Sequence, residues 1–104
     1  METNVQEKIK QQVEGHPVVL YMKGSPQFPQ CGFSATATQL LKLSGVGDIF
    51  TVDVLQNPDI GEGIKQYANW PTIPQLYVNG EFVDGSDILM EMYEAGELQP
   101  LLTA

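Results

Sequence analysis

The chain has 104 residues, of which 42% are apolar, and its 13 acidic and 5 basic side chains give a formal net charge of −8. A chain of this length builds one compact core and is too short for two ordinary domains, so we expect a single domain over residues 1–104. The charge has the wrong sign for a nucleic-acid or anionic-membrane binder, and no apolar stretch is long enough to span a bilayer.

The first residues, Met1-Glu2-Thr3-Asn4, do not resemble a secretory signal, because no basic region followed by an apolar run is present. The sequence contains one cysteine, so nothing indicates a fold stabilised by disulfides. We therefore expect a reducing compartment, the cytoplasm of a bacterial-type cell, while the mature form of an organellar protein fits the same pattern.

Four elements are predicted in the first half of the chain. Apolar residues recur every fourth position over residues 3–14, which indicates a helix, and residues 18–22 form an apolar run typical of a strand buried on both faces. A loop rich in glycine and proline at 23–30 leads to a second helix at 32–44, with Phe33, Ala37, Leu40 and Leu41 as its apolar positions. Alternation over 49–54 predicts a second strand.

The second half combines helices with a hairpin. Asn57 and Pro58 are typical of a helix start, and Ile60, Ile64 and Tyr67 follow on one face. Asn79-Gly80 predicts a tight turn between antiparallel strands at 76–78 and 82–83. A last helix is expected from residues 85–87 to Gly96, with an apolar stripe of Ile88, Leu89, Met92 and Tyr93. The predicted fold class is α/β, with a four-stranded mixed sheet flanked by helices on both faces.

Cys31 is the candidate reactive residue, because it precedes the second helix. Free N–H groups and the positive end of the helix dipole favour a thiolate at such a position. Ser34 stands where a two-cysteine redox motif carries its second sulfur, so only chemistry with an outside thiol is open to this chain. The alternative interpretation is a small buried hydrophobe, against which the neighbouring prolines and glycine argue. With one histidine, His16, a His/Cys metal site within one chain is not available.

A second candidate segment is Trp70-Pro71-Thr72-Ile73-Pro74, directly before the third strand. In a sheet of this topology it lies near the carboxyl-end crevice, where ligands of open α/β sheets collect.

Four motifs in order resemble the monothiol glutaredoxins of CGFS type, within the thioredoxin-like superfamily. They are Lys23-Gly24-Ser25-Pro26, Cys31-Gly32-Phe33-Ser34, Trp70-Pro71-Thr72-Ile73-Pro74-Gln75 and Gly85-Ser86-Asp87. The resemblance implies a glutaredoxin fold with Pro74 in cis, bound glutathione, and a [2Fe-2S] cluster shared by two protomers. A [2Fe-2S] cluster normally needs four thiolates, so two copies of Cys31 and two glutathiones would supply them.

The same resemblance assigns roles to individual residues. Cys31 is the nucleophile and the cluster ligand, Lys23 and Lys65 engage the glycine carboxylate of glutathione, and Ile73 pairs with it through the main chain. The complete set of expected cofactor-binding residues is Lys23, Phe33, Lys65, Thr72, Ile73, Pro74, Ser86 and Asp87. The resemblance also implies a homodimer, a heterodimer with a BolA-type protein, and apo iron-sulfur client proteins.

The chain departs from the family at two positions. Gly61 stands near a common arginine that assists the glutathione carboxylate, and Asp84 replaces the usual glycine before Gly85. We expect Asp84 to repel a ligand carboxylate. Two functions remain open at this point: a carrier that passes an iron-sulfur cluster to apoproteins, and a weak glutathione-dependent disulfide oxidoreductase that uses Cys31 as nucleophile. A binding module with an inert thiol is the third alternative.

Overall fold

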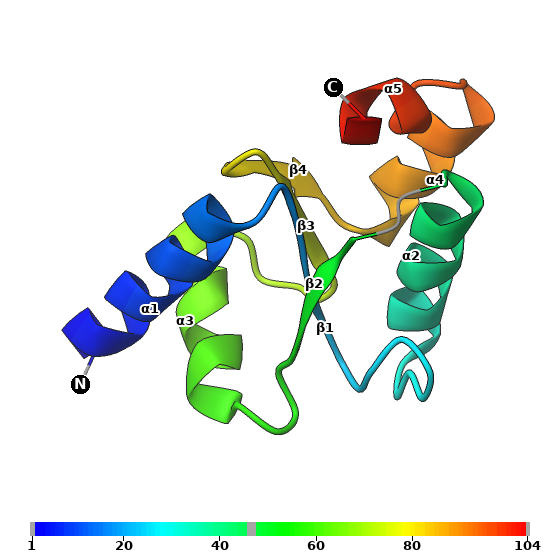
Figure 1. Cartoon of the computed structure of the whole chain (residues 1–104). Helices are drawn as coiled ribbons and strands as arrows, with labels where there is room; N and C mark the ends of the chain where they lie inside the picture. Colours follow the sequence, from blue (N-terminus) through cyan, green and yellow to red (C-terminus); the bar gives the residue numbers. More distant parts are fainter. Residues whose placement is uncertain (1, 46–47, 104) are drawn as a thin grey trace.

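The computed structural model describes residues 2–45 and 48–103, except for the side chains of residues 2, 3, 86 and 103. Figure 1 shows a central sheet with helices on two sides and the termini at opposite ends. The elements are α1 (Glu2–Gly15), β1 (Val18–Met22), α2 (Gly32–Leu43), β2 (Phe50–Asp53), α3 (Pro58–Ala68), β3 (Gln75–Val78), β4 (Glu81–Asp84), α4 (Ser86–Glu94) and α5 (Leu98–Thr103).

The four strands form one mixed sheet in the order β2-β1-β3-β4. β1 runs parallel to β2, with Val19 opposite Phe50, and antiparallel to β3, with Leu20 opposite Leu76. The predicted hairpin joins β3 to β4, and both turn residues, Asn79 and Gly80, have positive φ angles of 51° and 84°. These angles match the turn that suits the twist of two-stranded hairpins.

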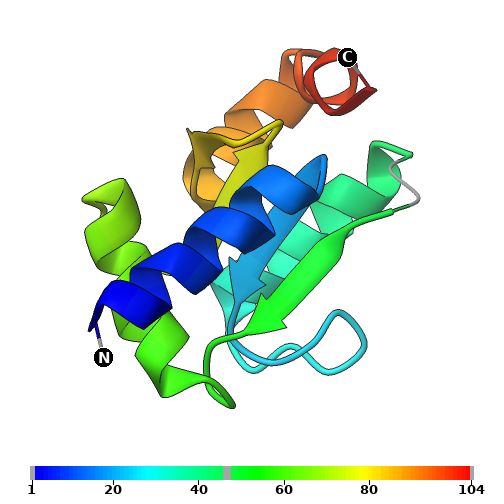
Figure 2. The same cartoon turned by 60° about the vertical axis from the view of Figure 1, so that its left-hand side comes forward.

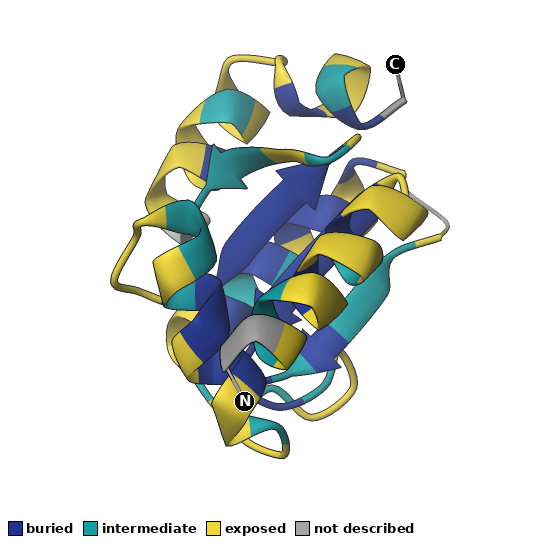
Figure 3. Cartoon of the chain, turned by 90° about the vertical axis from the view of Figure 1, so that its left-hand side faces the viewer, coloured by how far each residue is buried: buried dark blue, intermediate teal, exposed yellow. Residues whose placement is uncertain are grey.

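Two hydrophobic clusters cover the two faces of the sheet (Figures 1 and 2). One face of β1 and β3 packs against α2, α4 and α5, through residues that include Leu20, Leu41 and Leu98. The other face packs against α1 and α3 around Tyr21 and Tyr77. Every residue of β1 is buried, as predicted, and Figure 3 shows buried strands beneath helices whose outer faces are exposed. Among the described residues, no helix has the length and apolar character needed to cross a membrane.

Three predictions about the helices are wrong, one about the end of the chain and two about which apolar residues are buried. α4 is not the last helix, because α5 follows it and buries Leu98 in the core. Phe33, expected on the buried stripe of α2, is 61% exposed, whereas Ser34 is fully buried beside Ala37 and Leu41. The buried face of α2 thus begins at Ser34, whose hydroxyl accepts a hydrogen bond from the backbone N–H of Lys23, the residue that follows β1.

Ile88 and Tyr93 also fail as core residues of α4, since 38% and 39% of their respective surfaces remain exposed. Leu89 alone on that stripe is fully buried, and Met92 packs against the same cluster from a partly buried position. The core therefore uses a narrower face of α4 than its apolar pattern indicates.

Gly63 sets the approach of α3 to α1. A Cβ added there would lie 2.5 Å from Cγ1 of Val5 and 2.9 Å from Cδ1 of Ile9, and the Gly63 carbonyl accepts a hydrogen bond of 2.9 Å from Gln6 Nε2. We expect Gly63→Val to lower the free energy of unfolding by about 1–3 kcal/mol, because overpacking forces the helices apart. Gly15→Val is the control for denaturant unfolding, since nothing lies within 4 Å of its added Cβ. Equal stability of the two variants would contradict the packing argument.

Candidate functional site

A cleft of about 700 Å³ lies where β1 and β4 end and the segment before β3 begins. Its size is ordinary for a small-molecule site. The cleft brings together the predicted residues Lys23, Cys31, Phe33, Lys65, Thr72, Ile73, Pro74 and Asp87. The remaining predicted residue, Ser86, begins α4 at this site, but its side chain lies outside the described part of the structure.

Cys31 occupies the N-cap position of α2, in extended backbone geometry, with its side chain partly exposed. The Ser34 backbone N–H is the main cause that lowers the pKa of the Cys31 thiol below its ordinary value. Burial opposes this effect, while the Phe33 N–H, the charge of Lys23 and the Ser34 hydroxyl add to it. The Cys31 side chain does not cap α2. The N–H groups, the hydroxyl and the positive charge instead favour the thiolate, because they stabilise its negative charge. Cys31 therefore lies at a helix start, as predicted, and its neighbours lower the pKa of its thiol.

Ser34 has a structural task that its sequence position did not reveal. Its buried Oγ accepts a hydrogen bond of 3.0 Å from the backbone N–H of Lys23, eleven residues earlier. The residue at the place of a second sulfur therefore fixes the end of β1 against the first turn of α2.

The loop that delivers Cys31 is folded back on itself. Gln30 N–H donates to the Lys23 carbonyl at 2.9 Å, and Gly24, with φ of 89°, lies so close to the loop that an added Cβ would be 2.5 Å from the Phe28 carbonyl oxygen. Such a positive φ favours glycine. The loop is thus a defined turn that holds Lys23 and Cys31 near each other.

Asp53 ties this loop to the next connection. Its Oδ1 accepts hydrogen bonds from the backbone N–H groups of Gly24, at 3.0 Å, and Leu55, at 2.9 Å. The Asp53 carbonyl accepts a further bond of 3.0 Å from the Asn57 side chain, which therefore does not cap α3. The alternation over 49–54 predicted a strand and gave no role to Asp53, so its contribution to the site was missed.

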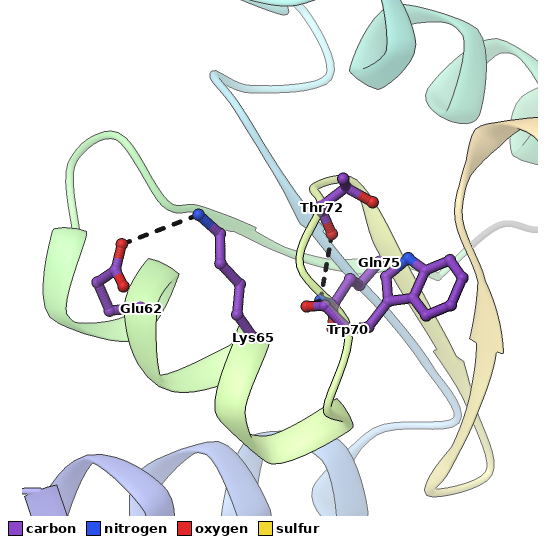
Figure 4. Close-up of polar contacts among 5 residues, drawn as sticks. All are labelled: Glu62, Lys65, Trp70, Thr72 and Gln75. Atoms are coloured by element: carbon purple, nitrogen blue, oxygen red, sulfur yellow. Dashed lines mark hydrogen bonds and ion pairs between the residues drawn. The ribbon is translucent and has the colours of Figure 1, made fainter.

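The charges around the cleft are separated by element. Lys23 and Lys65 come from the end of β1 and from α3, whereas Asp84 and Asp87 come from the end of β4 and from α4. α3 and α4 lie on opposite sides of the sheet in Figure 1. Lys65 has an ion pair of 3.8 Å with the exposed Glu62, a surface contact that contributes little to stability (Figure 4). The cleft therefore offers cations along one wall and carboxylates along the other.

The segment before β3 forms the floor between these walls. The Ile73–Pro74 peptide bond is cis, as the resemblance implies. Trp70 packs against Phe82 of β4, with ring centroids 5.9 Å apart, and keeps 39% of its surface exposed. The neighbouring Gly85 approaches closely, since an added Cβ would lie 3.3 Å from the Pro74 carbonyl oxygen.

Five further residues line the cleft, and they are Trp70, Pro71, Asp84, Gly85 and Ile88. Trp70, Pro71 and Asp84 were predicted to lie near the site without being assigned as binding residues. Membership of Trp70 and Pro71 in a matched motif was the available signal, whereas Ile88 was assigned to the core by its spacing. Gly61, by contrast, is buried in α3, and an added Cβ would lie 3.2 Å from Cβ of Val54.

Within the described part of the chain, no group of three or more histidine, cysteine, aspartate or glutamate side chains could hold a metal ion. Cys31 can supply one thiolate at the cleft, and any further thiolate must come from another molecule. The residues thus fit a shared cluster and do not fit a metal centre confined to one protomer.

Comparisons with known proteins agree with this geometry. The family model "Glutaredoxin" matches residues 18–83. The chain is 56% identical to Glutaredoxin 4 of Escherichia coli K12 over 92% of this chain and 83% of that protein, and 49% identical to the mitochondrial monothiol glutaredoxin-5 of Schizosaccharomyces pombe over 98% and 71%. The crystal structure of a buckwheat glutaredoxin–glutathione complex superposes with a TM-score of 0.84 at 25% identity, over 98% of this chain and 90% of that one.

Proposed function

Because this chain belongs to the glutaredoxin family, has its thioredoxin-like fold and carries one cysteine, we propose that it binds glutathione in the cleft and shares a [2Fe-2S] cluster between two protomers for delivery to apoproteins. The observation that supports this proposal most is the position of the sole thiol, partly exposed at a helix start and facing a cleft built from the other matched motifs. Its lowered pKa favours the thiolate that a cluster requires.

The charges of glutathione complement those of the cleft, because the tripeptide carries two carboxylates and one ammonium and the cleft has lysines on one wall and aspartates on the other. Its glycine carboxylate is assigned to Lys23 and Lys65, and the main chain of Ile73 is assigned to the middle of the tripeptide, in the manner of a short added strand. Its γ-glutamyl end is assigned to Ser86 and Asp87 at the start of α4, where free N–H groups receive a carboxylate. Thr72, Pro74 and the exposed ring of Phe33 complete the walls, and a relative in this fold has been solved as a complex with glutathione.

The cluster is treated as cargo. Two Cys31 thiolates and two glutathione thiolates satisfy its four sulfur positions, so the holo form requires a dimer. The proposed partners are a second copy of this chain, a BolA-type protein in a heterodimer, and apo iron-sulfur clients, with no nucleic acid and no membrane. A reducing compartment such as the cytoplasm suits an unpaired thiol.

The lowered pKa of Cys31 also favours a second activity, removal of glutathione from mixed disulfides. The Cys31 thiolate would attack the glutathione sulfur, form a mixed disulfide with it and release the substrate as a thiol. A second glutathione thiolate would attack that glutathione sulfur, release oxidised glutathione and restore the Cys31 thiolate. No second protein cysteine is needed.

Anaerobic reconstitution with iron, sulfide and glutathione, followed by native mass measurement, tests the first function. We expect a dimer with one [2Fe-2S] cluster and two glutathiones, which separates into monomers without cluster when glutathione is removed. A monomer that keeps the cluster in glutathione-free buffer would refute the ligand count. Rapid turnover of a glutathionylated substrate by protein that never takes up iron would instead select the second function.

Asp84 gives a prediction about affinity. Its Oδ1 accepts a hydrogen bond of 2.8 Å from Gly85 N–H, so the carboxylate is held at the α4 end of the cleft. Two carboxylates about 6 Å apart repel by about 0.7 kcal/mol in water and about 2.8 at an effective dielectric of 20. We therefore expect Asp84→Gly to bind glutathione several-fold more tightly, by calorimetry, with a gain that shrinks as salt rises.

Asp84→Asn separates the charge of this residue from its hydrogen bond, because the amide keeps an acceptor for Gly85 N–H. Both variants should bind more tightly if charge governs the effect. Weaker binding by Asp84→Gly at every ionic strength would identify Asp84 as a ligand contact and contradict the repulsion argument.

A further inference from the structure

Gln75 is a polar side chain with no exposed surface, placed at the first residue of β3 directly after Pro74. Its Nε2 lies 3.1 Å from the Trp70 carbonyl oxygen and 3.2 Å from the Thr72 carbonyl oxygen. Figure 4 shows the Gln75 side chain turned toward the segment that carries Trp70 and Thr72. One buried amide therefore holds two carbonyls of the cleft floor.

The orientation of this amide is fixed by its neighbours. Carbonyl oxygens only accept hydrogen bonds, so the nitrogen of Gln75 must face Trp70 and Thr72. Its Oε1 then accepts the hydroxyl of Tyr77 at 3.0 Å. Both donor positions and the acceptor are thus used, which is the condition under which a buried polar group gives a unique arrangement.

The contact with the Thr72 carbonyl also determines where the next N–H points. The Thr72–Ile73 peptide bond is trans, and in a trans peptide the carbonyl and the following N–H point in opposite directions. Because the Thr72 carbonyl faces the buried amide, the N–H of Ile73 is turned away from it. Thr72 and Ile73 both line the cleft.

We propose that Gln75 is the positioning residue for glutathione capture, because its amide turns the Thr72–Ile73 peptide so that the Ile73 N–H is presented to the tripeptide. Gln75 contacts no ligand in this scheme and acts through the main chain of the floor. The proposal rests on the proposed glutathione site, and it adds the element that keeps the floor ready before the ligand arrives. A pre-formed donor avoids the entropy cost of ordering a loop on binding.

The test uses Gln75→Glu and Gln75→Leu, with S-methylglutathione as a probe that carries no free thiol. A carboxylate cannot donate to two carbonyls, and leucine fills similar space without polar groups. We expect each variant to bind the probe at least about tenfold more weakly by calorimetry, because a floor that is no longer pre-formed must be ordered on binding. The backbone amide resonance of Ile73 should also shift in NMR spectra recorded without any ligand, because the Thr72–Ile73 peptide is no longer held by Gln75.

Tyr77→Phe is the matched control, because it removes the hydroxyl on the acceptor side and leaves both carbonyl contacts in place. It should bind the probe within about twofold of wild type and leave the Ile73 amide unchanged. The pH dependence of Cys31 alkylation should be the same in the two uncharged variants, Gln75→Leu and Tyr77→Phe, since Cys31 is held by α2 and the 23–30 loop. A change there as well would indicate general damage to the fold and would count against a local positioning role.

The possible outcomes separate this inference from the proposed function. If the wild-type protein does not bind S-methylglutathione, the proposed glutathione site is refuted. The NMR resonance of the Ile73 amide would still show whether Gln75 orients the Thr72–Ile73 peptide. Gln75 variants with wild-type affinity, or with an unchanged Ile73 amide, overturn the positioning role. If Gln75→Glu does not fold, Gln75→Leu alone decides by the same two measurements.

Discussion

Cys31→Ala should leave the chain folded and abolish the [2Fe-2S] cluster completely. The side chain is partly exposed and makes no capping hydrogen bond, so its loss removes few contacts. A surface change of this kind alters stability by about 0.5 kcal/mol or less. Circular dichroism during denaturation should give nearly the wild-type midpoint, while iron analysis and visible absorption after reconstitution should show no cluster.

Ser34→Ala is the informative companion to Cys31→Ala, because it keeps the thiol and removes a hydroxyl that stabilises the thiolate. The thiol pKa is lowered in wild type, so alkylation should remain fast at pH values where an ordinary cysteine is protonated. Loss of the hydroxyl should raise that pKa and move the alkylation profile to higher pH, although the Ser34 N–H remains.

A Cys31→Ala protein that still takes up a stoichiometric cluster would refute the carrier proposal.

The fold was predictable where local signals act alone. The apolar run of β1 and the Asn79-Gly80 turn each specify their geometry over a few residues, and both are confirmed. α5 was missed because it has only six residues, and Leu98 and Leu102 gain their burial by packing on the same cluster as α2 and α4. A helix of that length is not stable by itself, so its sequence pattern carries little signal.

Cys31 and the 70–74 segment were predicted from helix position and sheet topology, whereas the other residues of the site were predicted only through the motif resemblance. Its residues come from five separate segments, and periodicity places none of them beside another. Phe33 is an example, because it was counted in the apolar stripe of α2 and is exposed, whereas the next residue, Ser34, is buried. The burial of Ser34 depends on its hydrogen bond from the Lys23 N–H, which the spacing of apolar residues does not indicate. In the same way, the role of the Gln75 amide depends on the carbonyls three and five residues earlier, and the direction of those carbonyls cannot be predicted from the sequence.

Replacing both Lys23 and Lys65 with glutamine should produce the largest loss of glutathione affinity that leaves the thiol intact. Both lysines line the cleft, in a chain that has only five basic residues. Each charged contact contributes about 0.5–2 kcal/mol at a partly exposed position, so the pair should weaken binding by about 1–4 kcal/mol if their effects add. Calorimetry at low salt measures this directly.

The single variants should differ from each other. Lys65 already has Glu62 at 3.8 Å, which competes for its ammonium, whereas Lys23 also lowers the pKa of the Cys31 thiol. Lys23→Gln should therefore cost more affinity than Lys65→Gln, and it alone should move the alkylation profile of Cys31 to higher pH. Lys42→Gln is the control, since it makes the same change in net charge from the exposed last turn of α2. If the double variant binds glutathione as Lys42→Gln does, the two lysines are ordinary surface charges and the carboxylate must be held elsewhere in the cleft.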